Sequence, residues 1–202
     1  MTLESVNKNI IHQGNSIISL ETLPDYPHPV VVKKSSERTP SRSNIESLEN
    51  EYVMARSFNE VEGVRKALEQ RSTAIGPELI LEYVDGKTLR DHVYEKKLTL
   101  RSRLKIAVDL ARILAKIHEQ NVIHLDLNSQ NILIGNKGRA LHFIDLSAAS
   151  RIDGNVLHKI QPDQALGNLQ YISPEQTGRI NRAVDERSDL YSVVMDELHR
   201  VF

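Results

Sequence analysis

The sequence predicts an α+β protein, and three observations support this fold class. Short β-branched or apolar runs occur in the first third of the chain, and Val30-Val31-Val32-Lys33 is the clearest strand signal among them. From about residue 100 to 119, apolar side chains recur at helical spacing. Beyond that stretch, the apolar segments 131–134 and 140–144 flank a turn rich in Gly and Asn, which indicates a β-hairpin.

The elements expected in the N-terminal part follow in order. Strands are predicted at residues 9–11, 16–20 and 30–33, and residues 35–43 are expected to form a polar loop. A helix is predicted over 44–58, with Glu51 at the edge of its apolar face. That face consists of Ile45, Leu48, Tyr52 and Ala55. A further strand over 79–84 should end at a turn formed by Asp85 and Gly86.

The C-terminal part is predicted to be more helical. Thr99 is a candidate N-cap for the helix over 100–119. The apolar stripe of that helix comprises Leu100, Leu104, Ala107, Leu110, Ala111, Leu114 and Ile117, with His118 at its end. The hairpin that follows would carry Asn131 and Asp145 at its two ends. Residues 146–188 are expected to be irregular, and a last helix should begin near Asp189.

Composition narrows the class of protein. The 202 residues are enough for one substantial domain or two small lobes, and the formal net charge of −1 gives no electrostatic case for nucleic acid or an acidic membrane. The chain has no cysteine, which excludes disulfides and fits a reducing compartment. Neither a signal peptide nor an apolar run of membrane-spanning length is visible in the sequence. We therefore expect a cytoplasmic protein without a membrane segment.

A set of polar residues predicts phosphate chemistry. The segment HLDLNSQN places Asp126 five residues before Asn131, and the hairpin should bring Asp145 to the same edge. Oxygen ligands gathered in this way suit Mg²⁺, which is usually held by few protein groups plus substrate phosphates. Lys33 on a strand and Glu51 on the next helix would complete such a site. Each residue alone is more often a turn former or a surface charge, so the prediction depends on the ordered set.

The order of these residues resembles that of a protein kinase. The matching pieces are VVVK with Lys33, NEY with Glu51, LILEYVDGKTL (79–89), HLDLNSQN (124–131), IDLS with Asp145, GNLQYISPEQTGR (167–179) and DERSDLYS (185–192). The resemblance extends from about residue 9 to about residue 192. The stretch YISPEQTGRINRAVDERSDLYS is particularly similar to bacterial serine/threonine kinase domains that head large signalling proteins. In those proteins an ATPase region and often a sensor histidine kinase follow.

The resemblance implies both an architecture and an activity. It implies an antiparallel β-sheet N-lobe over 1–82, a hinge at 83–84 and a mostly helical C-lobe over 85–202. This C-lobe is expected to be incomplete, because the family's C-lobe continues well past the helix near Asp189. The implied activity is transfer of the γ-phosphate of ATP, with Mg²⁺, to a serine or threonine of a protein substrate in bacterial signalling. Further signalling modules are expected on a longer protein.

The resemblance also implies roles for the residues around the nucleotide. Lys33 would hold the α and β phosphates and pair with Glu51. Leu81 would be the gatekeeper, and the backbone at Glu82 and Val84 would meet the adenine.

Roles in the C-lobe follow in the same way. Asp126 would accept or orient the proton of the substrate hydroxyl, while Asn131 and Asp145 would bind Mg²⁺. Asp189 would hydrogen-bond the backbone near His124. The floor of the peptide site would be shaped by Tyr171 and Pro174, with its loop anchored by Glu175.

The sequence departs from the family in several places. The three glycine positions of the nucleotide-covering loop fall on Ile11, Gln13 and Ser16, whose side chains restrict close approach of backbone amides to phosphate. Leu125 replaces the arginine that pairs with a phosphorylated activation loop. Asn128 stands at the position of a lysine, and Asn168 at that of a threonine. Ser147 and Val194 each stand at the position of a glycine. The arginine partner of Glu175 lies beyond the present sequence, so this carboxylate is expected to be unpaired. The face of the last helix that carries Val193, Val194 and Leu198 is expected to be exposed.

Two alternatives to an active protein kinase remain open. A pseudokinase or decayed remnant that binds nucleotide or a partner is favoured by the glycine-poor loop and the short C-lobe. A small-molecule phosphotransferase also uses H-x-D-x-x-x-x-N, but GNLQYISPEQTGR resembles a peptide-docking floor and argues against it.

Overall fold

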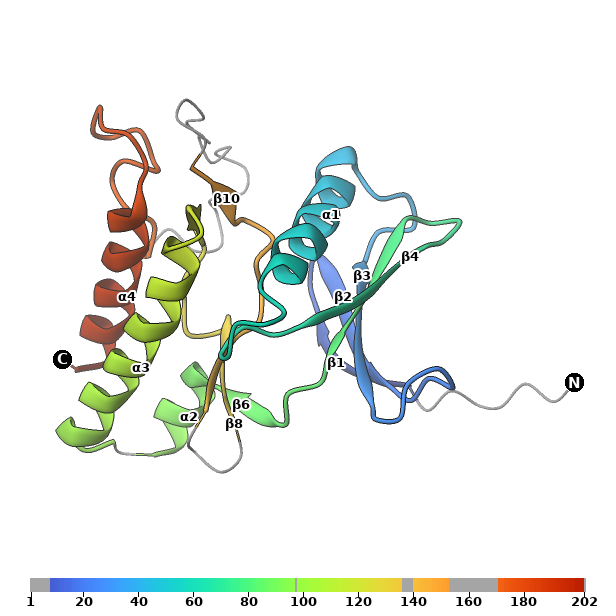
Figure 1. Ribbon diagram of the computed structural model, residues 1–202, viewed down its shortest axis with the longest axis horizontal. Coiled ribbons are helices and arrows are strands. Elements are labelled where there is room, and N and C mark those ends of the chain that lie inside the picture. Colours follow the sequence, from blue (N-terminus) through green and yellow to red (C-terminus); the bar gives the residue numbers. More distant parts are fainter. Residues whose placement is uncertain (1–7, 97, 136–139, 153–170, 202) are drawn as a thin grey trace, which may run out of the picture.

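The computed structural model describes residues 8–96, 98–135, 140–152 and 171–201 (Figure 1). In this part of the chain, the N-terminal region forms a five-stranded antiparallel sheet in the order β1-β2-β3-β5-β4. Its strands are β1 (Lys8–Gln13), β2 (Ser16–Glu21), β3 (Val30–Ser35), β4 (Ala67–Ser72) and β5 (Pro77–Glu82). Helix α1 (Arg42–Ser57) packs on this sheet and is capped by Ser41, whose side chain accepts a hydrogen bond from the amide of Asn44.

Strand β3 is apolar without alternation because both of its faces are covered. Val31 packs in the main hydrophobic core, with Leu79 and Leu81 of β5 and with helix α1. Val30 and Val32 point to the other face, where a smaller cluster also contains Leu23 and Ile80. Because side chains alternate along a strand, Lys33 lies on the same face as Val31, toward α1. The strand pattern thus aims the lysine at the helix.

The rest of the described chain contains three helices, of which α2 is short, and two small sheets. The helices are α2 (Leu89–Glu95), α3 (Leu100–His118) and α4 (Glu186–Val201), and α3 and α4 lie side by side (Figure 1). One sheet has the order β6-β8-β9, with β6 (Gly86–Thr88), β8 (Ile132–Gly135) and β9 (Leu141–Phe143). In the other, β7 (Val122–Ile123) pairs with β10 (Ser150–Arg151). The two-lobed α+β fold expected from the resemblance is confirmed.

Most of the expected elements are present. The strands β1, β2, β3 and β5, the helices α1 and α3 and the hairpin of β8 and β9 lie close to their predicted ranges. Thr99 caps α3 by accepting a hydrogen bond from the amide of Ser102. The last helix begins at Glu186, three residues before the predicted start. Residues 136–138 of the turn predicted over 135–138, and the replacement at Asn168, lie outside the described residues.

Some elements were not predicted, and one apolar stripe is only partly buried. Strand β4 reads ALEQRS, without a β-branched residue, and forms at the sheet edge because it pairs with β5. The short helix α2 and the two-residue strands were also missed, because each is shorter than the window in which periodicity can be seen. On α3, Leu110 and Leu114 are buried, whereas Leu100 and Leu104 are 71% and 58% exposed.

Candidate active site

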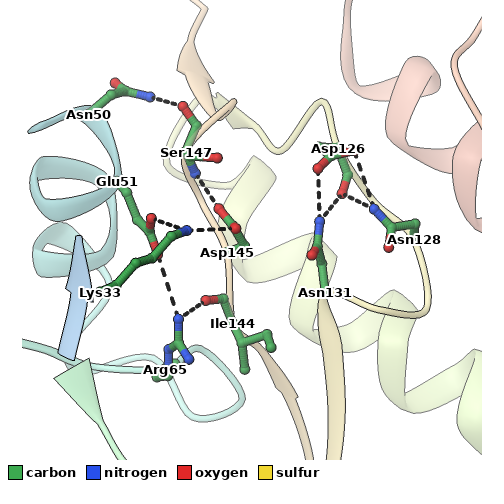
Figure 2. A network of polar contacts seen from close by, with 10 residues as sticks. All are labelled: Lys33, Asn50, Glu51, Arg65, Asp126, Asn128, Asn131, Ile144, Asp145 and Ser147. Atoms are coloured by element: carbon green, nitrogen blue, oxygen red, sulfur yellow. Dashed lines mark hydrogen bonds and ion pairs between the residues drawn. The ribbon is translucent and has the colours of Figure 1, made fainter. Parts of the chain in front are cut away.

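Lys33 lies at the centre of a buried charge network (Figure 2). Its Nζ is 2.5 Å from Oε2 of Glu51 on α1 and 2.8 Å from Oδ2 of Asp145, which follows β9. The side chains of Lys33 and Glu51 are 6% and 2% exposed, and that of Asp145 is 25% exposed. The strand, the helix and the hairpin therefore meet at one lysine, as the ordered set of residues suggested.

The charges in this network stabilise one another. Burial alone would lower the pKa of Lys33, but Asp145 and Glu51 outweigh it and raise that pKa above its ordinary value. Burial opposes ionisation of Asp145, yet the charge of Lys33 and hydrogen bonds from Lys33 and the Ser147 amide bring its pKa well below the usual range. Burial and repulsion from Asp145 raise the pKa of Glu51, against the attraction of its cationic neighbours. At neutral pH, Lys33 is protonated and Asp145 is ionised.

Arg65 is a member of this network that the sequence did not reveal. Its guanidinium Nη2 lies 3.6 Å from Oε1 of Glu51, and it donates a hydrogen bond to the carbonyl of Ile144 (Figure 2). The residue is only 6% exposed. In the sequence it sits beside Lys66 before a strand that was not predicted, so it reads as an ordinary surface charge.

Asp126 is held in place by two amide side chains of its own loop. Asn131 donates through Nδ2 to the Oδ2 of Asp126 at 2.8 Å and to its backbone oxygen at 2.9 Å. Asn128 donates to Oδ1 and to the same backbone oxygen, both at 3.2 Å. Two amides thus fix the orientation of a half-buried carboxylate. Asn128 stands where the family has a lysine, and in this chain it orients Asp126.

The backbone just before Asp126 adopts an uncommon conformation. Leu125 has φ +66°, in the left-handed region that costs a side chain with a Cβ roughly 1–2 kcal/mol. Its amide donates to Oδ1 of Asp189 at 2.8 Å, and its carbonyl accepts from Nε2 of Gln176 at 3.0 Å. Asp189 also accepts from the amide of His124 at 2.8 Å, which confirms the contact expected for it. Two distant side chains therefore hold the strained turn that presents Asp126.

The segment after Asp145 is fastened to helix α1. The amide of Ser147 donates to Oδ1 of Asp145 at 3.0 Å. Asn50, next to Glu51 on α1, donates through Nδ2 to the carbonyl of Ser147 at 2.9 Å (Figure 2). The same nitrogen donates to the carbonyl of Ala149, also at 2.9 Å. Ser147 does not have a positive φ, so the loss of the family's glycine at this position causes no backbone strain.

The residues expected around the adenine lie on β5 and just after it. Leu81 is 1% exposed and belongs to the main core. The amide of Glu82 already donates to the carbonyl of Lys66 at 2.9 Å. A contact from Glu82 to a base would therefore have to use its carbonyl oxygen. Val84 is half-buried in the segment that leads to β6.

The region expected to form a peptide floor packs against the start of α4. The carbonyl of Tyr171 accepts from Oγ of Ser192 at 2.7 Å, and Pro174 is half-buried. Oε1 of Glu175 accepts from Oγ of Ser188 at 2.7 Å. A serine on α4 thus gives the carboxylate a hydrogen-bond donor, whereas none of the salt bridges found among the described residues involves Glu175, as expected in the absence of its arginine. Of the expected exposed face, Val194 is 53% exposed, whereas Val193 packs against the core.

At this site a divalent cation would be bound by a few oxygen ligands and not by a complete set of protein ligands. Among the described residues, no group of three or more His, Cys, Asp or Glu side chains could hold a metal ion. Asn131 turns its nitrogen to Asp126, so its oxygen faces away from that residue. Ile144, which precedes Asp145, donates its amide to the carbonyl of Asn131 at 3.0 Å, so the two candidate ligands sit on adjacent backbone. One carboxylate and one amide oxygen fit Mg²⁺ that is shared with phosphates.

A strand lysine paired with a helix glutamate, above a loop that presents an aspartate and an asparagine, defines the protein kinase class of fold. A model of the protein kinase domain matches residues 15–195. The chain therefore belongs to the protein kinase domain family.

Curated proteins similar to the chain include bacterial serine/threonine-protein kinases. The serine/threonine-protein kinase PknB of Mycolicibacterium smegmatis is 35% identical over 118 residues, which are 58% of this chain and 18% of that protein. A probable serine/threonine-protein kinase of Streptomyces coelicolor is 31% identical over 117 residues, which are 57% of this chain and 17% of that protein. A probable serine/threonine-protein kinase of Clostridium perfringens is 33% identical over 116 residues, 57% of this chain and 16% of that protein. The chain thus aligns with less than a fifth of these relatives.

None of the helices in the described part of the chain combines the length and the apolarity that crossing a membrane requires.

Proposed function

We propose that this chain is a serine/threonine protein kinase domain that transfers the γ-phosphate of ATP to a hydroxyl of a protein substrate. The observation that carries the proposal is the contact of Lys33 with both Glu51 and Asp145. Membership of the protein kinase family and the similarity to bacterial serine/threonine-protein kinases support the same function.

Each residue of the network has a role in this proposal. Lys33, oriented by Glu51, holds the α and β phosphates as a fixed positive charge. Asp145 and Asn131 hold Mg²⁺, which neutralises charge on the phosphates. The carboxylate of Asp126 accepts the proton of the substrate hydroxyl while the hydroxyl oxygen of the substrate bonds to the γ-phosphorus. The bond between that phosphorus and the β–γ bridging oxygen breaks, and ADP leaves.

The proposed division of the chain follows the same interpretation. The N-lobe comprises residues 1–82, the hinge residues 83–84, and the partial C-lobe residues 85–202, with the adenine between Leu81 and the backbone of Glu82 and Val84. We also propose that the domain works in the cytoplasm on a protein substrate, and that a longer protein carries further signalling modules.

The test is phosphoryl transfer from labelled Mg·ATP to a generic basic protein by the purified chain. In Asp126→Ala, transfer should fall by about 100-fold or more, while Mg·ATP binding stays largely intact, because the carboxylate acts on the hydroxyl and not on the nucleotide. Asp109→Asn is a matched control, since Asp109 lies on α3 and, among the described residues, forms its ion pairs with Lys105 and Arg112. If Asp126→Ala keeps most of the activity, Asp126 is not the base.

A second candidate function is a nucleotide-binding module without turnover. It is favoured by the β1–β2 hairpin, where Ile11, Gln13 and Ser16 occupy the positions at which glycine would allow close backbone contact with phosphate. A folded chain that binds Mg·ATP but transfers no phosphate to proteins would favour this second function.

A further inference from the structure

Arg65 is a buried arginine at the junction of three elements. It lies between α1 and β4, is 6% exposed, and has Glu51 and the Ile144 carbonyl as partners. A guanidinium remains charged in proteins and is costly to bury without compensation. The position is therefore one where the fold has a specific use for a cation.

The backbone brings Arg65 to Asp145 through a short parallel contact with β9. Phe143 donates its amide to the carbonyl of Gly63 at 2.8 Å, and Arg65 donates its amide to the carbonyl of Phe143 at 2.9 Å. The turn into this contact needs Gly63, which has φ +94° and whose missing Cβ would lie 2.6 Å from the side chain of Ile113. Arg65 is thus fixed by backbone bonds beside the strand that leads to Asp145.

The charge balance of the site depends on Arg65. The buried network contains two carboxylates, Glu51 and Asp145, but only one ammonium, that of Lys33. Arg65 makes the four charges sum to zero, and Glu82 is a further negative charge that acts on the guanidinium. Without Arg65, Glu51 would depend on Lys33 alone, although Lys33 must also serve Asp145 and, in the proposed function, the phosphates.

We propose that Arg65 is a positioning residue of the phosphoryl-transfer site. It ties Glu51 of α1 to the backbone directly before Asp145, and it supplies Glu51 with a second cation when Lys33 engages phosphate. Loss of Arg65 removes one of the ties between α1 and the Asp145 segment, which the hydrogen bonds of Asn50 also join, and lets Lys33 move away from its productive position. This role rests on the proposed kinase function for its effect on catalysis, but the coupling of the two segments does not require that function.

The variants are Arg65→Met, which removes the charge, and Arg65→Lys, which keeps it. Arg56→Met is the matched control, because Arg56 also donates to a backbone carbonyl nearby, that of Ala67 at 3.2 Å, but does not contact Glu51. In Arg65→Met, kcat at saturating Mg·ATP should fall by about 10- to 100-fold, the size of effect expected from misplaced catalytic groups. Arg65→Lys should recover part of this loss, and Arg56→Met should stay within about twofold of wild type.

A double-mutant cycle separates positioning from a general loss of stability. In a Glu51→Gln background, Arg65→Met should cost much less in kcat than in wild type, because Arg65 acts through Glu51. The same fold loss in both backgrounds would overturn the proposal, as would a folded Arg65→Met with wild-type kcat. If Arg65→Met does not fold, Arg65→Lys in the two backgrounds provides the same comparison.

Amide hydrogen exchange tests the coupling without any activity. In Arg65→Met, but not in Arg56→Met, segments 42–57 and 140–152 should both exchange faster. Unchanged exchange in the two segments overturns the proposal. If wild type transfers no phosphate, the proposed function fails, and the exchange result still decides whether Arg65 couples α1 to the Asp145 segment.

Discussion

Replacement of Asp189 by asparagine should destabilise the chain and disorder the loop before Asp126. Asp189 is fully buried, and its carboxylate accepts hydrogen bonds from the amides of His124 and Leu125 and from Nε2 of His118, each at 2.8 Å. Asparagine has almost the same shape, so the change leaves no cavity. The change replaces one accepting oxygen by a donating nitrogen, and at least one of the donors at His118, His124 and Leu125 then faces this nitrogen in a buried contact.

The magnitude follows from these contacts. A buried amide left without an acceptor costs about 1–3 kcal/mol. The hydrogen bonds that remain lose their charge, and charged bonds are roughly twice as strong as neutral ones, which adds about 1–2 kcal/mol. We therefore expect a loss of about 2–5 kcal/mol in the free energy of unfolding, against about 5–15 kcal/mol for a typical domain.

Urea denaturation followed by circular dichroism measures this loss. Asp109→Asn is the control, because its exposed ion pairs on α3 should contribute at most about 1 kcal/mol. Relief of the positive φ of Leu125 should also reduce phosphoryl transfer in the fraction that remains folded. A loss below about 1 kcal/mol for Asp189→Asn would refute the reasoning that these bonds hold the loop.

Three further outcomes are expected. Asn50→Ala removes two hydrogen bonds to the segment after Asp145 and should lower the free energy of unfolding, measured by urea denaturation, by about 1–3 kcal/mol. Glu49→Ala, on the exposed side of α1, should change it little, and equal effects of the two variants would contradict this role of Asn50. Mg·ATP should raise the melting temperature more than ATP with a chelator, and Asp145→Asn should abolish the difference; equal shifts in wild type would remove the metal role of Asp145 and Asn131. Because the pKa of Asp145 is lowered in the folded state, its ionised carboxylate stabilises the fold above the ordinary carboxyl pKa of about 3.9, and this stabilisation is lost as pH falls through the folded pKa. The stability advantage of wild type over Asp145→Asn should therefore stay constant from about pH 7 to 5 and shrink below about pH 4. An advantage that grows on acidification would reverse the assigned sign.

The parts of the site that the sequence predicted are those with local signals. Lys33 ends a β-branched run, and alternation along the strand sets its direction before any tertiary contact is known. Asp126 and Asn131 lie five residues apart, and one donates to the other within a single loop. Asp189 was expected to reach the backbone near His124 only because of the resemblance, since that contact spans 65 residues.

The parts that the sequence did not predict depend on contacts between distant segments. Arg65 is aligned by a parallel contact with Phe143, and no pattern in residues 63–66 marks it as buried. Glu175 accepts a hydrogen bond from Ser188, 13 residues later on α4, and no local pattern in the sequence marks that serine as its donor. The backbone conformation of Leu125 could not be predicted from the sequence either, because its positive φ is imposed by Asp189 and Gln176, which lie outside its own loop.

The N-terminal hairpin and the charge network together suggest how nucleotide binding is divided in the proposed function. The pairing of β1 with β2 is irregular between Ile10 and His12, so Ile11, at the first glycine position of the family's loop, lies at the irregularity. Ile10 and Ile11 are each 52% exposed, and their side chains limit how closely backbone amides can approach a phosphate. With little help from that hairpin, phosphate binding must depend mainly on Lys33 and on the cation held beside Asp145. Because the position of Lys33 is fixed through Glu51, and that of Glu51 through Arg65, the contacts that place α1 against β9 should control nucleotide affinity as well as the rate of transfer.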